Sequence, residues 1–264
     1  MPVAYARIAE CLELADPLAK CLAVDALWAD VQAQGLAPAP ASAAPPIGQP
    51  GRPDAPQLVP AHQVPRRRLG SAAGRAALVH AIAHIEFNAI NLALDAAWRF
   101  RAMPEGYASD WLSVAYDEAR HFRLLTARLA DLQCAYGDFP AHNGLWDMAV
   151  KTADSVLERM ALVPRVLEAR GLDVTPGMIQ RLRAAGDEGT VAALEVILAE
   201  EVRHVEIGTR WFHFCCAEQG VDPDATFLHL LETRFDGAVK GPFNWPARMA
   251  AGFSEQEKQA LERA

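Results

Sequence analysis

Two short stretches of this chain repeat one pattern of acidic residues, arginine and histidine. The stretch DEARH occupies positions 117–121 and the stretch EEVRH occupies positions 200–204. Each contains Glu-x-x-His, and residues three apart lie on one face of an α-helix, so carboxylate and imidazole can bind one metal ion together. The repeat therefore predicts two pairs of metal ligands, Glu118 with His121 and Glu201 with His204.

Both glutamates lie on helix faces that are otherwise apolar. The stripe that contains Glu118 also contains Trp111, Val114, Ala115, Phe122 and Leu125, and the stripe of Glu201 contains Leu194, Ile197, Leu198 and Val205. An unpaired carboxylate buried among such residues would cost several kcal/mol. Because two such pairs need a common explanation, we expect a bound cation.

A site for two metal ions built from four helices needs one more glutamate from each of the two remaining helices. Glu86 lies on a wholly apolar stripe of the first long helix. The third long helix offers Glu158 and Glu168. Glu86 precedes Glu118 by 32 residues. In the second half of the pattern, Glu168 precedes Glu201 by 33 residues, whereas Glu158 precedes Glu201 by 43. Antiparallel helices bring residues of equal depth together, so the matching separations favour Glu168.

The predicted ligand set is therefore four carboxylates and two imidazoles: Glu86, Glu118, His121, Glu168, Glu201 and His204. Two divalent cations would offset the four negative charges. Such a set suits iron best, and manganese second, rather than structural zinc. A metal-bound histidine usually donates its other N–H to a carboxylate, so we expect Asp117 to support His204 and Glu200 to support His121. We expect His84 to contact the ligands from outside or to lie at the entrance of the metal site.

The elements that must position these residues are helices. Apolar residues recur at helical spacing in four long segments, at about 71–103, 108–136, 146–171 and 187–218, with shorter helices within 4–34 and 223–236. We expect Gly171 to end the third helix and Thr175 to cap a short helix, with an irregular tail after 236. The pattern predicts an all-α four-helix bundle at 71–264, preceded by a helical segment at 1–35 and a Pro-rich linker or wrapping arm at 36–70.

Composition argues against several classes of protein. The chain has 264 residues, 52% of them hydrophobic, and a net charge of −8, which does not favour nucleic acid or acidic membranes as partners. The basic cluster at 66–68 indicates a solvated linker. Five cysteines without a CxxC motif indicate free thiols in a reducing compartment. We expect no signal peptide and no membrane span, and a cytoplasmic location.

The ligand pattern resembles that of the ferritin-like di-iron carboxylate superfamily, which includes rubrerythrins, ribonucleotide reductase small subunits and bacterial multicomponent monooxygenases. The stretches GRPDAPQLVP, HAIAHIEFNAINLALD, YGDFPAHNGLWD, RMALVPRVLEARGLDVTP and EVRHVEIGTRWF are more closely similar to a bacterial family of ferritin-like proteins of unknown function. This resemblance runs from about residue 50 to the C-terminal AGF. It implies the fold and the metal site. VLEARG, around Glu168, is also similar to the third-helix segment of tRNA-modifying di-iron hydroxylases.

Three functions fit these observations. The first is an oxidase or hydroxylase that uses two iron ions to activate O₂ for a small-molecule substrate, with an unidentified electron donor. The second is an iron-handling or peroxide-scavenging protein, which the absence of rubredoxin-type CxxC pairs makes less favoured. The third is a helical interaction module with a structural metal. The sequence is also compatible with a homodimer.

Overall fold

The computed structural model describes residues 1–64 and 69–263. Every named element in this part of the chain is helical, so the all-α prediction is confirmed. The chain forms two compact units, an N-terminal unit (Met1–Asp147) and a C-terminal unit (Met148–Ala264). The predicted boundaries at residues 35 and 70 stay predictions, and the basic cluster at 66–68 lies outside the described residues.

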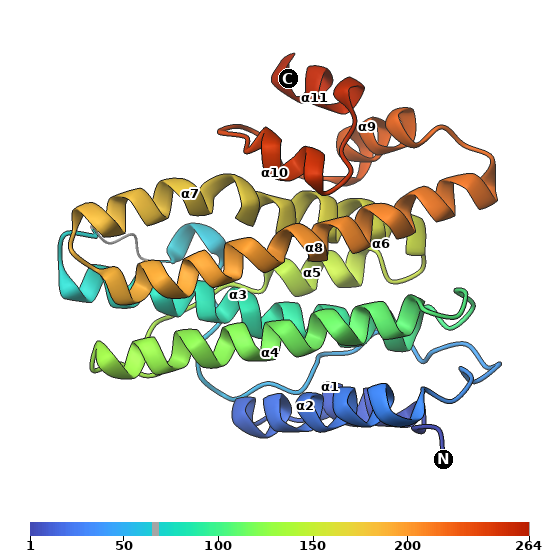
Figure 1. The fold of residues 1–264 in the computed structure, drawn as a ribbon, viewed down its shortest axis with the longest axis horizontal. Helices are drawn as coiled ribbons and strands as arrows, with labels where there is room; N and C mark the ends of the chain where they lie inside the picture. Colours follow the sequence, from blue (N-terminus) through green and yellow to red (C-terminus); the bar gives the residue numbers. More distant parts are fainter. Residues whose placement is uncertain (65–68, 264) are drawn as a thin grey trace. The chain divides into compact units, whose positions relative to one another are not determined.

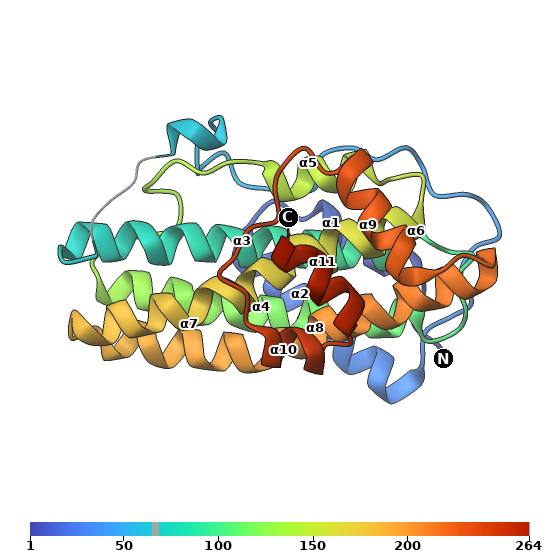
Figure 2. The same cartoon turned by 90° about the horizontal axis from the view of Figure 1, so that it is seen from above.

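Two long helices form the centre of the N-terminal unit. Helices α3 (Ala72–Arg99) and α4 (Tyr107–Asp131) pack along each other and lie side by side in both views (Figures 1 and 2). The side chain of Ser71 caps α3 by accepting a hydrogen bond from the backbone N–H of Gly74. Both helices were predicted, and both end four to five residues earlier than their apolar patterns indicate.

Two N-terminal helices pack on this pair, as the sequence predicts for residues 4–34. Helix α1 (Ala6–Glu13) packs on α3, and α2 (Pro17–Gln34) packs on α4 (Figure 1). Asp16 caps α2, and its carboxylate lies 2.7 Å from the backbone nitrogen of Ala19. A proline follows at the first helical position, where its missing N–H costs nothing.

The Pro-rich segment runs without helix from residue 36 to residue 60 and is tied to the N-terminal unit by hydrogen bonds. The backbone N–H of Gly51 donates to the carbonyl of Leu12, and the Gly51 carbonyl accepts from the Lys20 ammonium at 2.9 Å. A Cβ at position 51 would lie 2.1 Å from the Glu13 carbonyl oxygen, so only glycine fits this close approach.

Helix α3 is the one described helix that is long and apolar enough to cross a membrane. However, 78% of its most apolar window is buried inside the protein, as in the core helix of a soluble protein. Its apolar character therefore reflects packing against neighbouring helices.

The C-terminal unit also contains a long helix packed along a second helical segment. Helix α8 (Glu188–Gln219) packs along three consecutive elements, namely α6 (Val156–Leu162), a π-helical turn η2 (Val163–Glu168) and α7 (Ala169–Ala184) (Figures 1 and 2). Helix α9 (Pro223–Arg234) follows. The predicted bounds of α8 are confirmed, with Asp187 as its N-cap and Gly220 in the left-handed conformation at its end.

The third long helix differs from its prediction. Instead of one helix at 146–171, a short α5 (Gly144–Lys151) ends before Ser155, whose hydroxyl oxygen accepts a hydrogen bond from the Glu158 N–H and starts α6. The Arg159 guanidinium donates to the carbonyl of Ala149 at 2.6 Å and to the Thr152 hydroxyl at 2.7 Å. These bonds satisfy the end of α5 through tertiary contacts that periodicity does not reveal.

The predicted helix end at Gly171 and the predicted cap at Thr175 are wrong. Helix α7 continues through both positions, with Pro176 in its interior. A proline there deprives the carbonyl four residues earlier, that of Leu172, of its helical donor. The side-chain amide of Asn244 donates to this carbonyl at 3.1 Å. A partner 72 residues away therefore removes part of the cost that makes proline a helix breaker.

The tail predicted to be irregular contains two helices, α10 (Trp245–Ala250) and α11 (Glu255–Arg263). Asn244 caps α10, with its side-chain oxygen 3.4 Å from the Ala247 nitrogen. Ser254 caps α11, where its hydroxyl accepts from the Glu257 N–H while the Glu257 carboxylate accepts from the Ser254 N–H, both at 3.0 Å. This reciprocal pair is a capping box, and the sequence SEQE carries its signature.

Candidate metal centre

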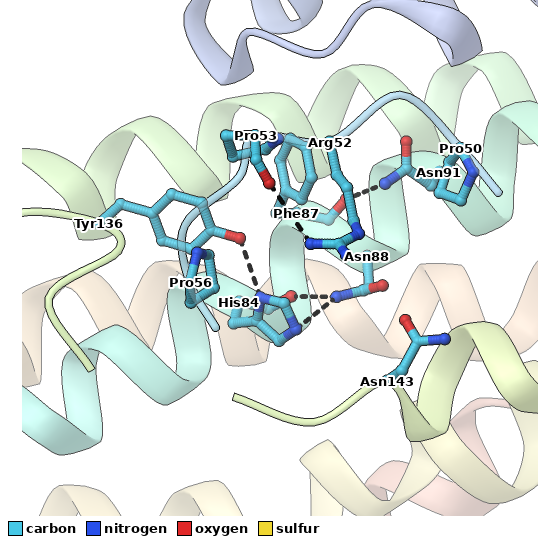
Figure 3. Close-up of a pocket in the computed structure, with 10 residues that line it drawn as sticks. All are labelled: Pro50, Arg52, Pro53, Pro56, His84, Phe87, Asn88, Asn91, Tyr136 and Asn143. Carbon is cyan, nitrogen blue, oxygen red and sulfur yellow. Dashed lines mark hydrogen bonds between the residues drawn. The ribbon is translucent and has the colours of Figure 1, made fainter. Parts of the chain in front are cut away.

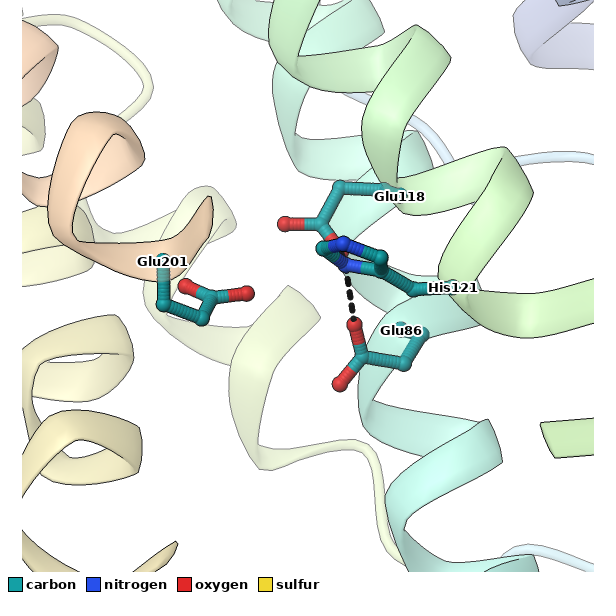
Figure 4. A group of neighbouring side chains, drawn as sticks. All are labelled: Glu86, Glu118, His121 and Glu201. Carbon is teal, nitrogen blue, oxygen red and sulfur yellow. Dashed lines mark hydrogen bonds and ion pairs between the residues drawn. The ribbon is translucent and has the colours of Figure 1, made fainter. Parts of the chain in front are cut away.

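Three of the predicted ligands come together in the N-terminal unit. Glu86 lies on α3, and Glu118 and His121 lie one turn apart on α4 (Figure 4). Nδ1 of His121 is 3.1 Å from Oε2 of Glu86 and 3.3 Å from Oε2 of Glu118. The three residues are 4%, 1% and 0% exposed, so two carboxylates and an imidazole share a site with almost no access to water.

The electrostatics of this triad follow from its burial and its two acids. Burial alone lowers the pKa of His121, but hydrogen bonds and charge from Glu118 and Glu86 outweigh it and raise the pKa to about 11. The pair of carboxylates thus strongly favours a positive charge between them. The His121 imidazolium supplies one such positive charge to the carboxylates of Glu118 and Glu86.

The local sequence explains why these side chains point inward. Ala83 and Ile90 flank Glu86 at helical spacing on α3, and both are fully buried. On α4, Val114 and Leu125 flank Glu118 and His121 in the same way, also at 0% exposure. The apolar stripes bury against neighbouring helices and carry the acids and the histidine into the interior with them.

The C-terminal unit carries the other three predicted ligands. Glu201 and His204 lie one turn apart on α8, with 3.5 Å between Oε1 of Glu201 and Nδ1 of His204. They are 8% and 0% exposed. Glu168 is half-buried at the last residue of η2, on the segment that packs along α8.

The alternative acid of the third helical segment has a different environment. Glu158 lies in the first turn of α6, and its Oε2 is 2.7 Å from the Arg234 guanidinium of α9. This carboxylate therefore has a cationic partner, and the choice of Glu168 as the candidate ligand stays a prediction.

The π-helical turn before Glu168 has an identifiable cause. Pro164 lacks a backbone N–H and cannot make the normal α-helical bond. Its ring packs against α8 at Gly208, where an added Cβ would lie only 2.2 Å from the Pro164 Cγ. Single π-helical turns within α-helices occur frequently at functional sites, and this one ends at the candidate ligand.

Three buried side chains of the N-terminal unit, Glu86, Glu118 and His121, offer ligand atoms of the kind that could hold a metal ion (Figure 4). Carboxylate oxygens and imidazole nitrogens are ligands for divalent iron and manganese, and no thiolate takes part in this group. The residues therefore fit a metal centre rich in oxygen ligands, and the identity of the metal stays a prediction.

The acidic residues that precede the two Glu-x-x-His pairs are both half-buried. Asp117 forms an ion pair with Arg120 at 3.4 Å, one turn along α4. Glu200 lies at the equivalent position on α8. The expected contacts of Asp117 with His204 and of Glu200 with His121 stay predictions.

His84 lies in a different place from the triad. The side-chain direction rotates by about 200° around the helix axis over two residues of an α-helix. His84 and Glu86 therefore point to nearly opposite sides of α3. Within the described residues, His84 bonds to the Tyr136 hydroxyl at 2.9 Å and to the Asn88 amide at 3.1 Å (Figure 3). It also bonds to the carbonyl of His142 at 3.2 Å.

This second cluster surrounds a small cavity of about 10 Å³, the size of one water molecule. Its lining includes Arg52 and Pro53 from the Pro-rich segment and Asn88 from α3 (Figure 3). Burial lowers the pKa of His84 to about 4, so its imidazole is neutral at pH 7. The sequence does not predict this cluster because its partners come from three separate segments, and only the polar residues on α3 signal it.

Comparison with known proteins supplies a family. An uncharacterized protein of Haemophilus influenzae is 48% identical over 212 residues, covering 78% of this chain and 74% of that protein. No solved structure matches the chain. Residues 13–259 match a family model described as "Protein of unknown function (DUF455)", and the chain belongs to this family.

Proposed function

We propose that this protein is a ferritin-like di-metal carboxylate protein that acts as an O₂-dependent oxidase or hydroxylase on a small organic substrate. Each unit would contribute half of the ligands to two divalent ions, iron in the first place and manganese in the second. The N-terminal unit would contribute Glu86, Glu118 and His121, and the C-terminal unit would contribute Glu168, Glu201 and His204.

The observation that carries the proposal is the duplication of one buried arrangement. Helix α4 buries Glu118 with His121, and α8 buries Glu201 with His204, each pair one helical turn apart. In each unit the helical segment that packs along this helix carries a further glutamate, which is Glu86 on α3 and Glu168 on η2. Two matching sets of three suit a pair of ions better than a single one.

The charges of the buried residues support an ion at this position. Glu86 and Glu118 share one imidazole, so their two negative charges meet at most one positive charge among the three residues. Two carboxylates and an imidazole are ligands that divalent iron and manganese bind, and the protein would contribute a site from which bulk water is excluded.

The proposed reaction assigns separate tasks to the metal and to the chain. Iron or manganese, when bound, would supply the redox chemistry with O₂ that amino-acid side chains lack. The chain would hold its ligands on rigid helices, and the burial of His121 and His204 at 0% exposure would keep water away from the site.

Metal analysis with a matched pair of variants tests the ligand set. Protein purified without chelators should contain about two iron or manganese ions per chain. Glu168→Gln should lose metal, whereas Glu158→Gln, which changes the acid paired with Arg234, should retain it. If wild-type protein binds no metal even after anaerobic loading with Fe(II), the proposal is wrong. If only Glu158→Gln loses metal, the ligand assignment is wrong.

Oxygen consumption then tests the reaction class. Protein loaded with Fe(II) in the absence of air should consume O₂ when mixed with buffer containing it, and Glu118→Gln should do so far more slowly. A purely structural metal predicts that a chelator lowers the melting temperature while O₂ consumption stays at the background rate. Assembly into a large shell, detected by size-exclusion chromatography, would instead indicate iron storage.

A further inference from the structure

The C-terminal segment contacts the helical segment that bears Glu168. We call residues 244–257, which comprise α10, its connection to α11 and the first turn of α11, the C-terminal clasp. The clasp contacts this segment at two places, and both contacts involve a fully or almost fully buried arginine bound to a buried acid. Charged pairs of this kind are rare in protein interiors, so their role needs an explanation.

We call each of the two contacts an anchor. The first anchor joins α11 to η2. Nη2 of Arg165 lies 2.7 and 2.8 Å from the two carboxylate oxygens of Glu257, and both side chains are 0% exposed. Three aromatic rings surround the Arg165 guanidinium at 4.2 to 4.7 Å from their centroids: Phe212, Phe227 and Phe253. Arg165 therefore has one well-defined position, set by cation–π contacts and by Glu257.

The second anchor joins α10 to α7. Nε and Nη2 of Arg248 bind the two oxygens of Asp173 at 2.9 and 2.8 Å. Beside this pair, Asn244 donates its backbone N–H to Asp173 at 3.0 Å and its side-chain amide to the Leu172 carbonyl at 3.1 Å. The latter bond replaces the one that Pro176 cannot make.

These two anchors lie on either side of Glu168. Arg165 precedes it by three residues, and Leu172 and Asp173 follow it by four and five, so each anchor is about one helical turn away. Glu168 itself is the residue at which the π-helical turn passes into α7. The π-helical turn departs from the regular hydrogen bonding of an α-helix, so contacts from outside the segment can influence the direction of its side chains.

We propose that the C-terminal clasp sets the position of the Glu168 carboxylate, and that Glu257 and Asn244 are positioning residues for the metal ion that Glu168 binds. The inference rests on the proposed di-metal site. It adds that a segment distant in sequence from every predicted ligand controls one of them. Loss of either anchor should weaken the binding of the ion held by Glu168. The binding of the ion held by the N-terminal unit should be less affected.

Cobalt titration of the full-length protein provides the test, because Co(II) reports its ligand geometry in the visible spectrum. Wild-type protein should bind two Co(II) ions. Glu257→Gln and the milder Asn244→Ser, whose hydroxyl can still cap α10, should bind the second ion about 10- to 100-fold more weakly, as expected for residues that orient a ligand. Their spectra at saturation should also differ from that of the wild type. Glu255→Gln, an exposed acid on the same helix, is the matched control.

Hydrogen exchange of the metal-free proteins provides a second readout. Amides of residues 163–172 should exchange faster in Glu257→Gln than in the wild type, while those of α3 and α4 keep their protection. Two variants with wild-type cobalt affinities and spectra would overturn the inference, even if exchange accelerates, because the clasp would then only stabilise the fold. Wild-type protein that binds no Co(II) would overturn the proposed function and this inference together.

Discussion

The buried ammonium of Lys20 makes the stability of the N-terminal unit depend on pH in an unusual direction. Lys20 is 0% exposed, and its three hydrogen bonds go to the carbonyls of Leu12 and Gly51, at 2.9 Å each, and to the side chain of Asn91. Burial lowers the pKa of Lys20 from 10.5 to about 7, against opposing effects from Cys11 and Cys21. The three acceptors satisfy the ammonium, but none of them carries a negative charge.

The sign of the effect follows from this lowered pKa. Between pH 7 and 10.5 the folded protein has released the Lys20 proton while the unfolded chain still binds it, so the free energy of unfolding should rise with pH. The slope is at most about 1.4 kcal/mol per pH unit. From pH 7 to 8.5, Lys20 should contribute an increase of about 1.5 to 2 kcal/mol. Below pH 6 the contribution should be constant.

Denaturant unfolding of wild-type protein and Lys20→Met measures this contribution as a difference between the two proteins. Tryptophan fluorescence suits the experiment because four of the six tryptophans lie in the N-terminal unit. Measurements should stop near pH 8.5, because burial raises the pKa of Cys11 and Cys21 to about 11 and stability should fall as pH rises above 9. Lys240→Met, at an exposed site, is the control. A wild-type-minus-variant difference that stays flat between pH 7 and 8.5 would refute the reasoning.

Three further predictions concern single contacts. Gly208→Ala should place a methyl group 2.2 Å from the ring of Pro164 and destabilise the protein by about 1 to 3 kcal/mol or more, measured as a lower melting temperature. The pKa of His84 is lowered to about 4, so stability should fall by up to about 3 kcal/mol as pH falls from 6.5 to 4, and His84→Gln should abolish this part of the acid sensitivity. Asp187→Ala removes the oxygen that accepts from the Thr190 N–H at 3.1 Å, and we expect a loss of about 1 kcal/mol in denaturant unfolding, with Asp187→Ser largely retaining stability.

The sequence by itself was sufficient for features that depend on neighbours along the chain. Spacing of three residues places Glu118 beside His121 and Glu201 beside His204, because an α-helix turns once every 3.6 residues. The start of the fourth long helix at position 187 was equally readable, and Asp187 is the N-cap of α8. The buried position of Glu86 also followed from the apolar residues at helical spacing around it.

Only the tertiary structure decided features whose partners lie far away in the chain. Pro176 reads as the start of a helix, yet it lies inside α7 because Asn244 supplies a donor to the Leu172 carbonyl. The tail reads as irregular, yet Glu257 is buried against Arg165. Local propensity is worth at most about 1 kcal/mol per residue for most residue types, whereas a buried ion pair or a satisfied carbonyl can outweigh it. Such contacts leave no periodic pattern in the sequence, and they become visible only when the packed chain brings their two sides together.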